Sequence, residues 1–152
     1  MIAVMDYGAG NLRSVVRAVE HAGARPVVTD RAEDIRAASA VILPGVGAAA
    51  DTMRNLAARG LITPVKDVIQ AGKPFLGICM GLQALLDGSE EGGWQECLGV
   101  IAGRVRRLPP GLKVPHMGWN RVHQRVAHPI FDGIADGAYC YFVHSYYVDP
   151  LD

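Results

Sequence analysis

The sequence is poor in cysteine and has no excess charge of either sign. Its 152 residues include three cysteines, Cys79, Cys97 and Cys140, and no two of them form a C-x-x-C pair. This argues against a disulfide framework and against a zinc site. Fifteen basic residues balance fifteen acidic ones, which removes the electrostatic footprint of a nucleic-acid-binding protein. The glycines of Gly8–Gly10 lack the third glycine of a dinucleotide fingerprint, because Arg13 occupies its position, so we expect no cofactor.

A basic leader and a long apolar run are also missing. The N-terminal stretch Met1–Met5 is followed at once by the acidic Asp6, which does not fit a secretory signal. No apolar run approaches the ~18 residues of a membrane span. We therefore expect a soluble protein of the reducing cytoplasm, with no nucleic-acid or membrane partner.

The composition that remains is that of a globular domain. Half of the residues are hydrophobic and 18 are glycine, which supplies enough apolar material for a sizeable core. We expect one domain that spans residues 1–152.

Short apolar runs alternate with amphipathic stretches in the first half of the chain. The uniformly apolar runs are predicted strands: Met1–Met5, Pro26–Val28, Ala40–Leu43 and Pro74–Ile78. Helices are predicted between them, from Asn11 to Gly23 and near Glu33–Ala37, Asp51–Ala58 and Leu61–Gln70. Leu82, Leu85 and Leu86 predict one further short helix. This alternation is typical of an α/β fold, here an open doubly wound (flavodoxin-like) and mostly parallel sheet.

The pattern changes from Gly99 onward. Strands with alternating polarity are predicted at Val100–Leu108, Trp119–Gln124 and Tyr139–Val148. Alternation is typical of a strand with one exposed face, so we expect a mixed or antiparallel region added to the parallel sheet. No linker or low-complexity tract separates the two halves.

Cys79 stands in the pattern Gly77-Ile78-Cys79-Met80-Gly81, directly after a predicted strand. A strand-to-helix turn of the form Gly-x-nucleophile-x-Gly exposes its central side chain, with glycines where a Cβ has no room. The N–H of Met80, at the start of the following helix, is then a natural donor to an oxyanion. The alternative is an ordinary buried thiol at a tight turn.

A second donor loop follows the strand predicted at Ala40–Leu43. Its residues Gly45, Val46 and Gly47 can present backbone N–H groups. In an open α/β sheet, the carboxyl ends of neighbouring strands meet at one edge. We therefore expect this loop to lie beside Cys79.

Four stretches occur in the order and spacing of one known family: PGVG, GICMGLQ, KVPHMGWN and YFVHSYY. On these motifs the sequence resembles the glutaminase subunits of imidazole glycerol phosphate synthase, which are class I (triad-type) glutamine amidotransferases of histidine biosynthesis. The resemblance implies that a cysteine attacks the side-chain amide of L-glutamine, releases ammonia and leaves a γ-glutamyl thioester that water hydrolyses. It also implies a heterodimer with a cyclase subunit. That subunit is a (β/α)₈ barrel that uses the ammonia to make imidazole glycerol phosphate and an aminoimidazole carboxamide ribotide.

The resemblance assigns roles to the two glycine-bearing loops. Cys79 takes the place of the nucleophile, and Met80 takes a place in the oxyanion hole. Gly45, Val46 and Gly47 supply the rest of the oxyanion hole. The two glycine patterns, taken without the resemblance, indicate the same residues.

Four further residues match the family's substrate site. Gln83 and Glu91 match glutamine-binding side chains, and Ser145 and Tyr146 match the strand whose backbone holds the substrate. Without the resemblance, Gln83 fits a solvated helix residue, and Glu91, beside Glu90, fits a surface charge.

The segment Pro115–Asn120 resembles the part of the family that faces the cyclase. It implies that Trp119 and Asn120 are interface residues. On its own, a tryptophan in this setting fits a core position as well as a partner surface.

The base of the catalytic triad is the main departure from the family. The family supplies it as the histidine of a late His-Pro-Glu stretch, which the residues up to Asp152 do not contain. His128 is followed by Pro129 and Ile130, so we interpret it as a loop residue, and His144 is an alternative base. We expect a C-terminally truncated chain that is nearly inactive alone, because losing one triad member removes most of the triad's effect. The alternatives are a non-catalytic chain that docks onto the cyclase, and another cysteine hydrolase or a thiol sensor on the same fold.

Overall fold

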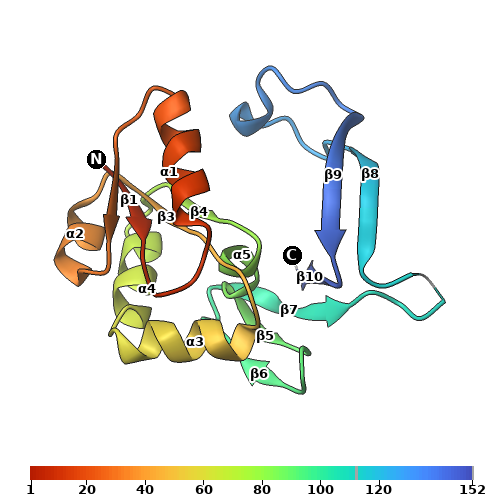
Figure 1. Ribbon diagram of the computed structural model, residues 1–152, viewed down its shortest axis with the longest axis horizontal. Helices are drawn as coiled ribbons and strands as arrows, with labels where there is room; N and C mark the ends of the chain where they lie inside the picture. The colour runs from red at the N-terminus through yellow and green to blue at the C-terminus, as the bar shows by residue number, and fades with distance from the viewer. Residues whose placement is uncertain (112, 152) are drawn as a thin grey trace. The chain divides into compact units, whose positions relative to one another are not determined.

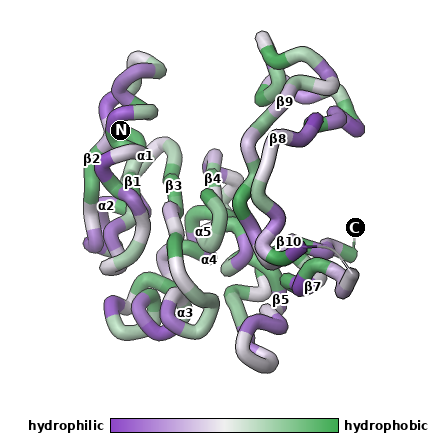
Figure 2. Tube along the Cα trace, turned by 45° about the vertical axis from the view of Figure 1, so that its right-hand side comes forward, coloured by the Kyte–Doolittle hydropathy of each residue, from purple (hydrophilic) through white to green (hydrophobic). Residues whose placement is uncertain are grey.

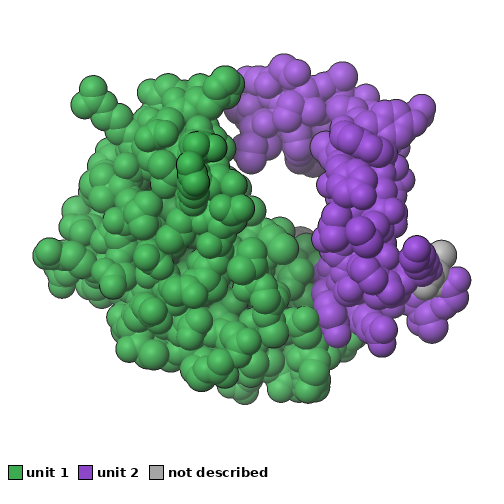
Figure 3. All heavy atoms as spheres, viewed as in Figure 1, with its two compact units in different colours: residues 1–106, 148–152 green, residues 107–147 purple. Residues whose placement is uncertain are grey.

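The computed structural model describes residues 1–111 and 113–151. It divides into two compact units, coloured separately in Figure 3: residues 1–106 with 148–152, and residues 107–147. The chain enters the second unit once and leaves it once, so this unit is a continuous insertion into the first. The single domain expected over residues 1–152 stays a prediction.

A parallel sheet lies in the first unit (Figure 1). Its strands are β1 (Ile2–Met5), β2 (Pro26–Thr29), β3 (Ala40–Leu43) and β4 (Phe75–Gly77), in the order β2-β1-β3-β4. All neighbouring pairs are parallel, which confirms the α/β fold with a mostly parallel sheet. The predicted strands match these within one residue at each end, because uniformly apolar runs fit strands that are covered on both faces.

Helices connect these strands in the order predicted. They are α1 (Leu12–His21), α2 (Ala32–Ala37), α3 (Ala49–Ala58), α4 (Ile62–Gln70) and α5 (Met80–Gln83). The side chain of Asn11 caps α1 by accepting a hydrogen bond from the N–H of Ser14 at 3.2 Å. Hydrophobic and hydrophilic stretches alternate around α3 in Figure 2, the pattern of a helix that buries one face. Within the described residues, no helix has the length and apolar character that crossing a membrane requires.

The core lies on one face of the parallel sheet. Strand order and right-handed connections place α1 on one face and α2 and α4 on the other. On the second face, Met5 and Leu43 of the sheet are fully buried together with Ile35 of α2, Leu56 of α3 and Val65 of α4. Helices on both faces make the sheet doubly wound, and this packing fixes the positions at which β1, β3 and β4 deliver their following loops.

A second, mixed sheet follows α5, where the sequence predicts a helix through Leu86. Its strands are β5 (Leu86–Ser89), β6 (Gln95–Glu96), β7 (Ile101–Arg107) and β10 (Tyr146–Pro150), in the order β10-β7-β5-β6. The helix prediction is wrong beyond Gln83, because Leu86 pairs with Ile101 and its carbonyl accepts from the N–H of Gly99. Strand pairing thus overrides the helical spacing of the leucines. The strand predicted at Val100–Leu108 is confirmed as β7.

The second unit contains an antiparallel pair, β8 (His116–Val122) with β9 (Ala138–His144), and a short 3₁₀ helix, η1 (Pro129–Phe131). The sequence predicts the first strand from Trp119, but β8 begins at His116, where its pairing with β9 starts. The strand predicted at Tyr139–Val148 is divided at Ser145, whose carbonyl accepts from the N–H of Leu108 at 3.0 Å instead of pairing with β8. The predicted antiparallel region is therefore present with different boundaries.

Candidate active site

Three glycine-bearing loops follow β1, β3 and β4 at their carboxyl ends. They comprise residues 6–11, 44–48 and 78–79, the last of which is flanked by Gly77 and Gly81. The loops touch one another: a Cβ on Gly10 would lie 3.1 Å from the Cβ of Pro44, and one on Gly45 would lie 2.5 Å from the nitrogen of Gly81. The second distance is shorter than a real Cβ contact, so only glycine fits at position 45. The fold thus brings the loop after β3 against the turn that carries Cys79.

Cys79 adopts a backbone conformation that L-residues rarely take. Its φ is 54° and its ψ is −112°, and it is the only non-glycine residue with positive φ among the described residues. Such a conformation costs ~1–3 kcal/mol and persists only where the surrounding structure imposes it. Here the N–H of Ile78 donates to the carbonyl of Leu43 at 3.0 Å, which ties the turn to β3. The Cys79 side chain is exposed, so it is not the buried thiol of the alternative interpretation.

Gly77 and Gly81 flank Cys79 because no side chain fits at either position. A Cβ on Gly81 would lie 1.9 Å from the carbonyl oxygen of Leu43, and one on Gly77 would lie 2.7 Å from the nitrogen of Leu82. The Gly-x-Cys-x-Gly pattern is therefore a packing requirement of the turn that presents the thiol.

Two backbone segments can supply hydrogen-bond donors beside Cys79. Met80 is the first residue of α5, so its N–H has no acceptor within that helix. Val46 is 53% exposed on the loop after β3, and Gly47 has a φ of 90°. Because α5 spans only four residues, its dipole is small, and individual N–H groups matter more than the dipole. This arrangement suits the attack of a sulfur on a carbonyl carbon whose oxygen gains charge.

Gln83 and Glu91 lie in the same unit as Cys79. Gln83 ends α5, is half-buried, and donates its N–H to the carbonyl of Cys79 at 3.0 Å. Glu91 lies in the turn after β5, and its Oε2 accepts from the N–H of Ala49 at 3.2 Å. Glu91 is therefore half-buried and attached to the start of α3, unlike a solvated surface charge.

Comparison with known proteins decides the family. The family model for class-I glutamine amidotransferases matches residues 3–152. The chain belongs to this family. The HisH subunit of imidazole glycerol phosphate synthase from Dehalococcoides mccartyi (strain CBDB1) is 53% identical over 152 residues, which cover 100% of this chain and 74% of that protein. The HisH subunit from Herpetosiphon aurantiacus is 56% identical over 153 residues, which cover 100% of this chain and 72% of that protein.

Solved structures of glutamine amidotransferases share the fold. One crystal structure aligns with a TM-score of 0.74 at 20% identity. The alignment covers 99% of this chain and 75% of the chain in that structure. Another, from Thermotoga maritima, aligns with a TM-score of 0.62 at 17% identity. The alignment covers 97% of this chain and 61% of the chain in that structure. These structures confirm the fold, and the HisH relatives confirm the resemblance to subunits of imidazole glycerol phosphate synthase.

The second unit of this amidotransferase carries Ser145 and Tyr146. Both are half-buried and lie where β9 gives way to β10. The Ser145 carbonyl accepts from the N–H of Leu108, and the Tyr146 carbonyl lies 3.1 Å from Nδ1 of His144. Their backbone is thus fixed by hydrogen bonds within the second unit.

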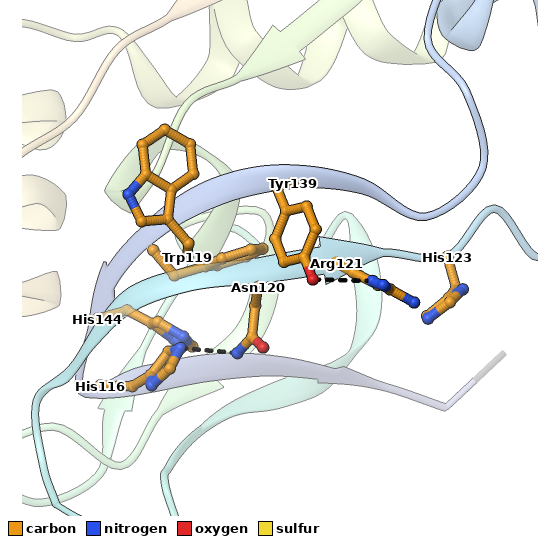
Figure 4. Close-up of a pocket in the computed structure, with 8 residues that line it drawn as sticks. His116, Trp119, Asn120, Arg121, His123, Tyr139 and His144 are labelled. Carbon is orange, nitrogen blue, oxygen red and sulfur yellow. Dashed lines mark hydrogen bonds between the residues drawn. The ribbon is translucent and has the colours of Figure 1, made fainter.

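Trp119 and Asn120 point to opposite faces of the β8–β9 pair (Figure 4). The indole of Trp119 lies edge-on to the ring of Tyr141, with centroids 5.5 Å apart. Asn120 lies on the other face, where its Nδ2 is 3.0 Å from Nε2 of His116. The Trp119 side carries apolar residues that are each more than half exposed, and we call it the aromatic face: Met117, Trp119, Tyr141 and Val143.

The histidines of the second unit make contacts of their own. Nδ1 of His128 accepts from the N–H of Ile130 at 3.1 Å and so caps η1, which agrees with its interpretation as a loop residue. The ring of His144 lies edge-on to that of His116, with centroids 5.5 Å apart.

Sequence reasoning missed two buried hydroxyls close to the nucleophile. Tyr7 and Thr52 are 0% and 1% exposed, and neither hydroxyl makes a well-formed hydrogen bond among the described residues. Burial raises the pKa of Tyr7, the nearby Thr52 hydroxyl lowers it, and the Cys79 thiolate raises it. The signal was present in the sequence, because Tyr7 continues the inward-facing series of β1 and Thr52 stands one helical turn before the buried Leu56.

Proposed function

We propose that this amidotransferase hydrolyses L-glutamine to glutamate and ammonia through a thioester on Cys79. The observation that carries the proposal is the exposed Cys79 at φ 54°, between two glycines that packing requires. The sulfur attacks the side-chain amide carbon, and the amide nitrogen leaves as ammonia with the proton of the thiol. Water then hydrolyses the γ-glutamyl thioester and restores the thiol.

The proposed contacts to the substrate follow the roles that the family resemblance assigns. The N–H groups of Met80 and of residues 45–47 stabilise the oxyanion, and loss of one such donor typically costs ~10²–10³-fold in kcat. Gln83 and Glu91 bind the glutamine, the carboxylate of Glu91 being complementary to its ammonium group. The backbone of Ser145 and Tyr146 holds the amino-acid end. We also propose one class I domain over residues 1–152, which the family match over residues 3–152 supports.

The proposed partner is a cyclase subunit with a (β/α)₈ barrel. The chain would form a heterodimer with it in the cytoplasm and pass ammonia to its lyase reaction in histidine biosynthesis. Two observations support a partner: the relatives are each named as a subunit of imidazole glycerol phosphate synthase, and the aromatic face exposes large apolar side chains of the kind that partner surfaces bury. Because Asn120 points to the other face, we assign the docking contact first to Trp119.

A second candidate function is that of a non-catalytic chain that docks onto the cyclase. One feature of the sequence favours it: residues 1–152 contain no His-Pro-Glu stretch of the kind from which the family takes its base. A cysteine nucleophile needs a base that takes its proton and returns it to the leaving ammonia. This candidate predicts complex formation without hydrolysis of glutamine.

The experiment that separates these functions measures glutamate release by the purified chain, with and without the cyclase subunit. The Cys79→Ala variant is the control. Release that requires Cys79 supports the glutaminase, and so does labelling of Cys79 by a glutamine-derived chloroketone that free glutamine blocks. Complex formation in analytical ultracentrifugation, with neither release nor labelling, overturns the proposal in favour of the docking chain.

A further inference from the structure

The helix α3 begins without a capping side chain in its own segment. Its N-cap residue is Ala48, which has extended backbone and no hydroxyl or carboxylate to offer. The first N–H of the helix, that of Ala49, instead donates to Oε2 of Glu91 at 3.2 Å. Ala49 is 1% exposed, so water is a poor substitute for this acceptor. A carboxylate at the positive end of a helix is also favoured by the charge of that end.

Glu91 is itself held in place. Its N–H donates to Oγ of Ser89 at 3.2 Å, and Ser89 is 0% exposed. The N–H of the neighbouring Glu90 donates to the carbonyl of Val105 in β7 at 3.0 Å. The turn after β5 is therefore attached to the mixed sheet, and the Glu91 carboxylate is a fixed point for α3.

The start of α3 is one end of the loop that carries the proposed oxyanion donors. Residues 44–48 join the end of β3 to α3. At the β3 end the loop is fixed by Gly45, whose Cα has no room for a Cβ against Met80 and Gly81. In the middle, Val46 and Gly47 are exposed, so their backbone depends on the two ends of the loop.

We propose that Glu91 is a positioning residue for the oxyanion loop. Its carboxylate fixes Ala49, and through Ala49 it fixes the backbone of Val46 and Gly47 beside Cys79. This role is additional to any contact between Glu91 and the substrate, and it rests on the proposed function. A side chain in the turn after β5 thus sets the geometry of the loop that follows β3.

Two substitutions separate this role from substrate binding. Glu91→Gln keeps an oxygen that accepts from the N–H of Ala49 but loses the charge that an ammonium group needs. Glu91→Ala loses both. We expect KM for glutamine to rise in both variants, whereas kcat stays within about threefold of the wild type in Glu91→Gln and falls at least ~10-fold in Glu91→Ala. Glu90→Ala, which removes the adjacent carboxylate that lies 3.6 Å from Arg104, is the matched control and should change neither value.

Hydrogen exchange supplies a readout that does not depend on turnover. In the complex with the cyclase, the amide of Ala49 should exchange at least ~10-fold faster in Glu91→Ala than in the wild type, Glu91→Gln or Glu90→Ala. Where Glu91→Ala does not fold, Glu91→Asp takes its place, because the shorter side chain keeps the charge but withdraws the acceptor from Ala49. Equal kcat in the variants with and without the acceptor, or unchanged exchange at Ala49, overturns the positioning role. An inactive wild type with normal exchange differences would instead count against the glutaminase alone.

Discussion

Gly81 approaches the carbonyl oxygen of Leu43 so closely that a Cβ on Gly81 would lie 1.9 Å from it. The oxygen belongs to the backbone of β3, so it cannot move aside without disturbing the sheet. We predict that Gly81→Ala lowers the free energy of unfolding by more than ~3 kcal/mol, measured by urea denaturation followed by circular dichroism. Gly72→Ala is the control, because its φ is 69° but no atom lies within 4 Å of the added Cβ. That variant should lose only the ~1–2 kcal/mol of left-handed backbone strain, and equal losses would contradict the steric argument.

The buried hydroxyls of Tyr7 and Thr52 predict an unusual pair of stabilising substitutions. Each hydroxyl is buried without a well-formed hydrogen bond among the described residues, and such a group costs ~1–3 kcal/mol. Tyr7→Phe and Thr52→Val remove it while they keep the shape of the side chain. We expect unfolding free energies that are unchanged or higher by ~1 kcal/mol in urea titrations. A loss above ~1 kcal/mol in either variant would mean that its hydroxyl has a partner, such as a buried water.

The three cysteines should differ in reactivity. Cys79 and Cys140 are exposed, whereas burial raises the pKa of the Cys97 thiol to about 11. Since the thiolate is the reactive form, iodoacetamide at about pH 8 should modify Cys79 and Cys140 at least ~10-fold faster than Cys97. Mass spectrometry of the digested protein measures all three rates in one sample. Comparable labelling of Cys97 in the folded chain would show that its site opens readily.

The same thiol gives a pH dependence of stability. The folded chain holds the Cys97 proton up to about pH 11, while the unfolded chain loses it near the ordinary value of 9.0. Folding therefore binds more protons in this window, and the contribution of Cys97 to stability falls as the pH rises from about 9 to about 11. Cys97→Ala should show a shallower alkaline loss of the unfolding free energy than the wild type, by denaturant titration across this range. Parallel curves for the two proteins would rule out this contribution.

The aromatic face predicts how the chain binds its partner. Trp119 is 67% exposed and packs edge-on against Tyr141, which gives a partner a large and rigid contact. We expect Trp119→Ala to weaken the complex with the cyclase at least ~30-fold, the loss typical of a central aromatic contact, in isothermal titration calorimetry. Val126→Ala is the control, since Val126 is 69% exposed but lies outside β8 and β9. If both variants bind like the wild type, the docking surface lies elsewhere.

The sequence predicts the parallel sheet well because its signals are local. The runs Ala40–Leu43 and Pro74–Ile78 are apolar throughout and bounded by turn residues, and each coincides with a strand within one residue. The side chain of Asn11 caps α1 as its position before the apolar stripe indicates. The Gly-x-Cys-x-Gly pattern also predicts the tight turn, because backbone atoms leave no room for a side chain at positions 77 and 81.

Long-range pairing explains what the sequence could not reveal. Leu86 has the spacing of a helical residue, but its pairing with Ile101 makes it the first residue of β5. Ser145 interrupts a strand that looks continuous, because its carbonyl bonds to Leu108 rather than to β8. The contact of Glu91 with Ala49 spans 42 positions and has no local signature. Such contacts depend on which segments the fold brings together, and propensity and periodicity carry no information on that.

The hydrogen bond between Leu108 and Ser145 bears on how freely residues 107–147 can vary in length. It joins two residues near the ends of a 41-residue insertion, residues 107–147, through one hydrogen bond of 3.0 Å. The strands that lead into and out of the insertion, β7 and β10, are neighbours in one sheet. A segment whose ends meet in this way can be lengthened, shortened or exchanged while the flanking strands keep their register. The nucleophile Cys79 and its flanking glycines lie outside residues 107–147, so a change in the length of this insertion leaves their own turn unaltered.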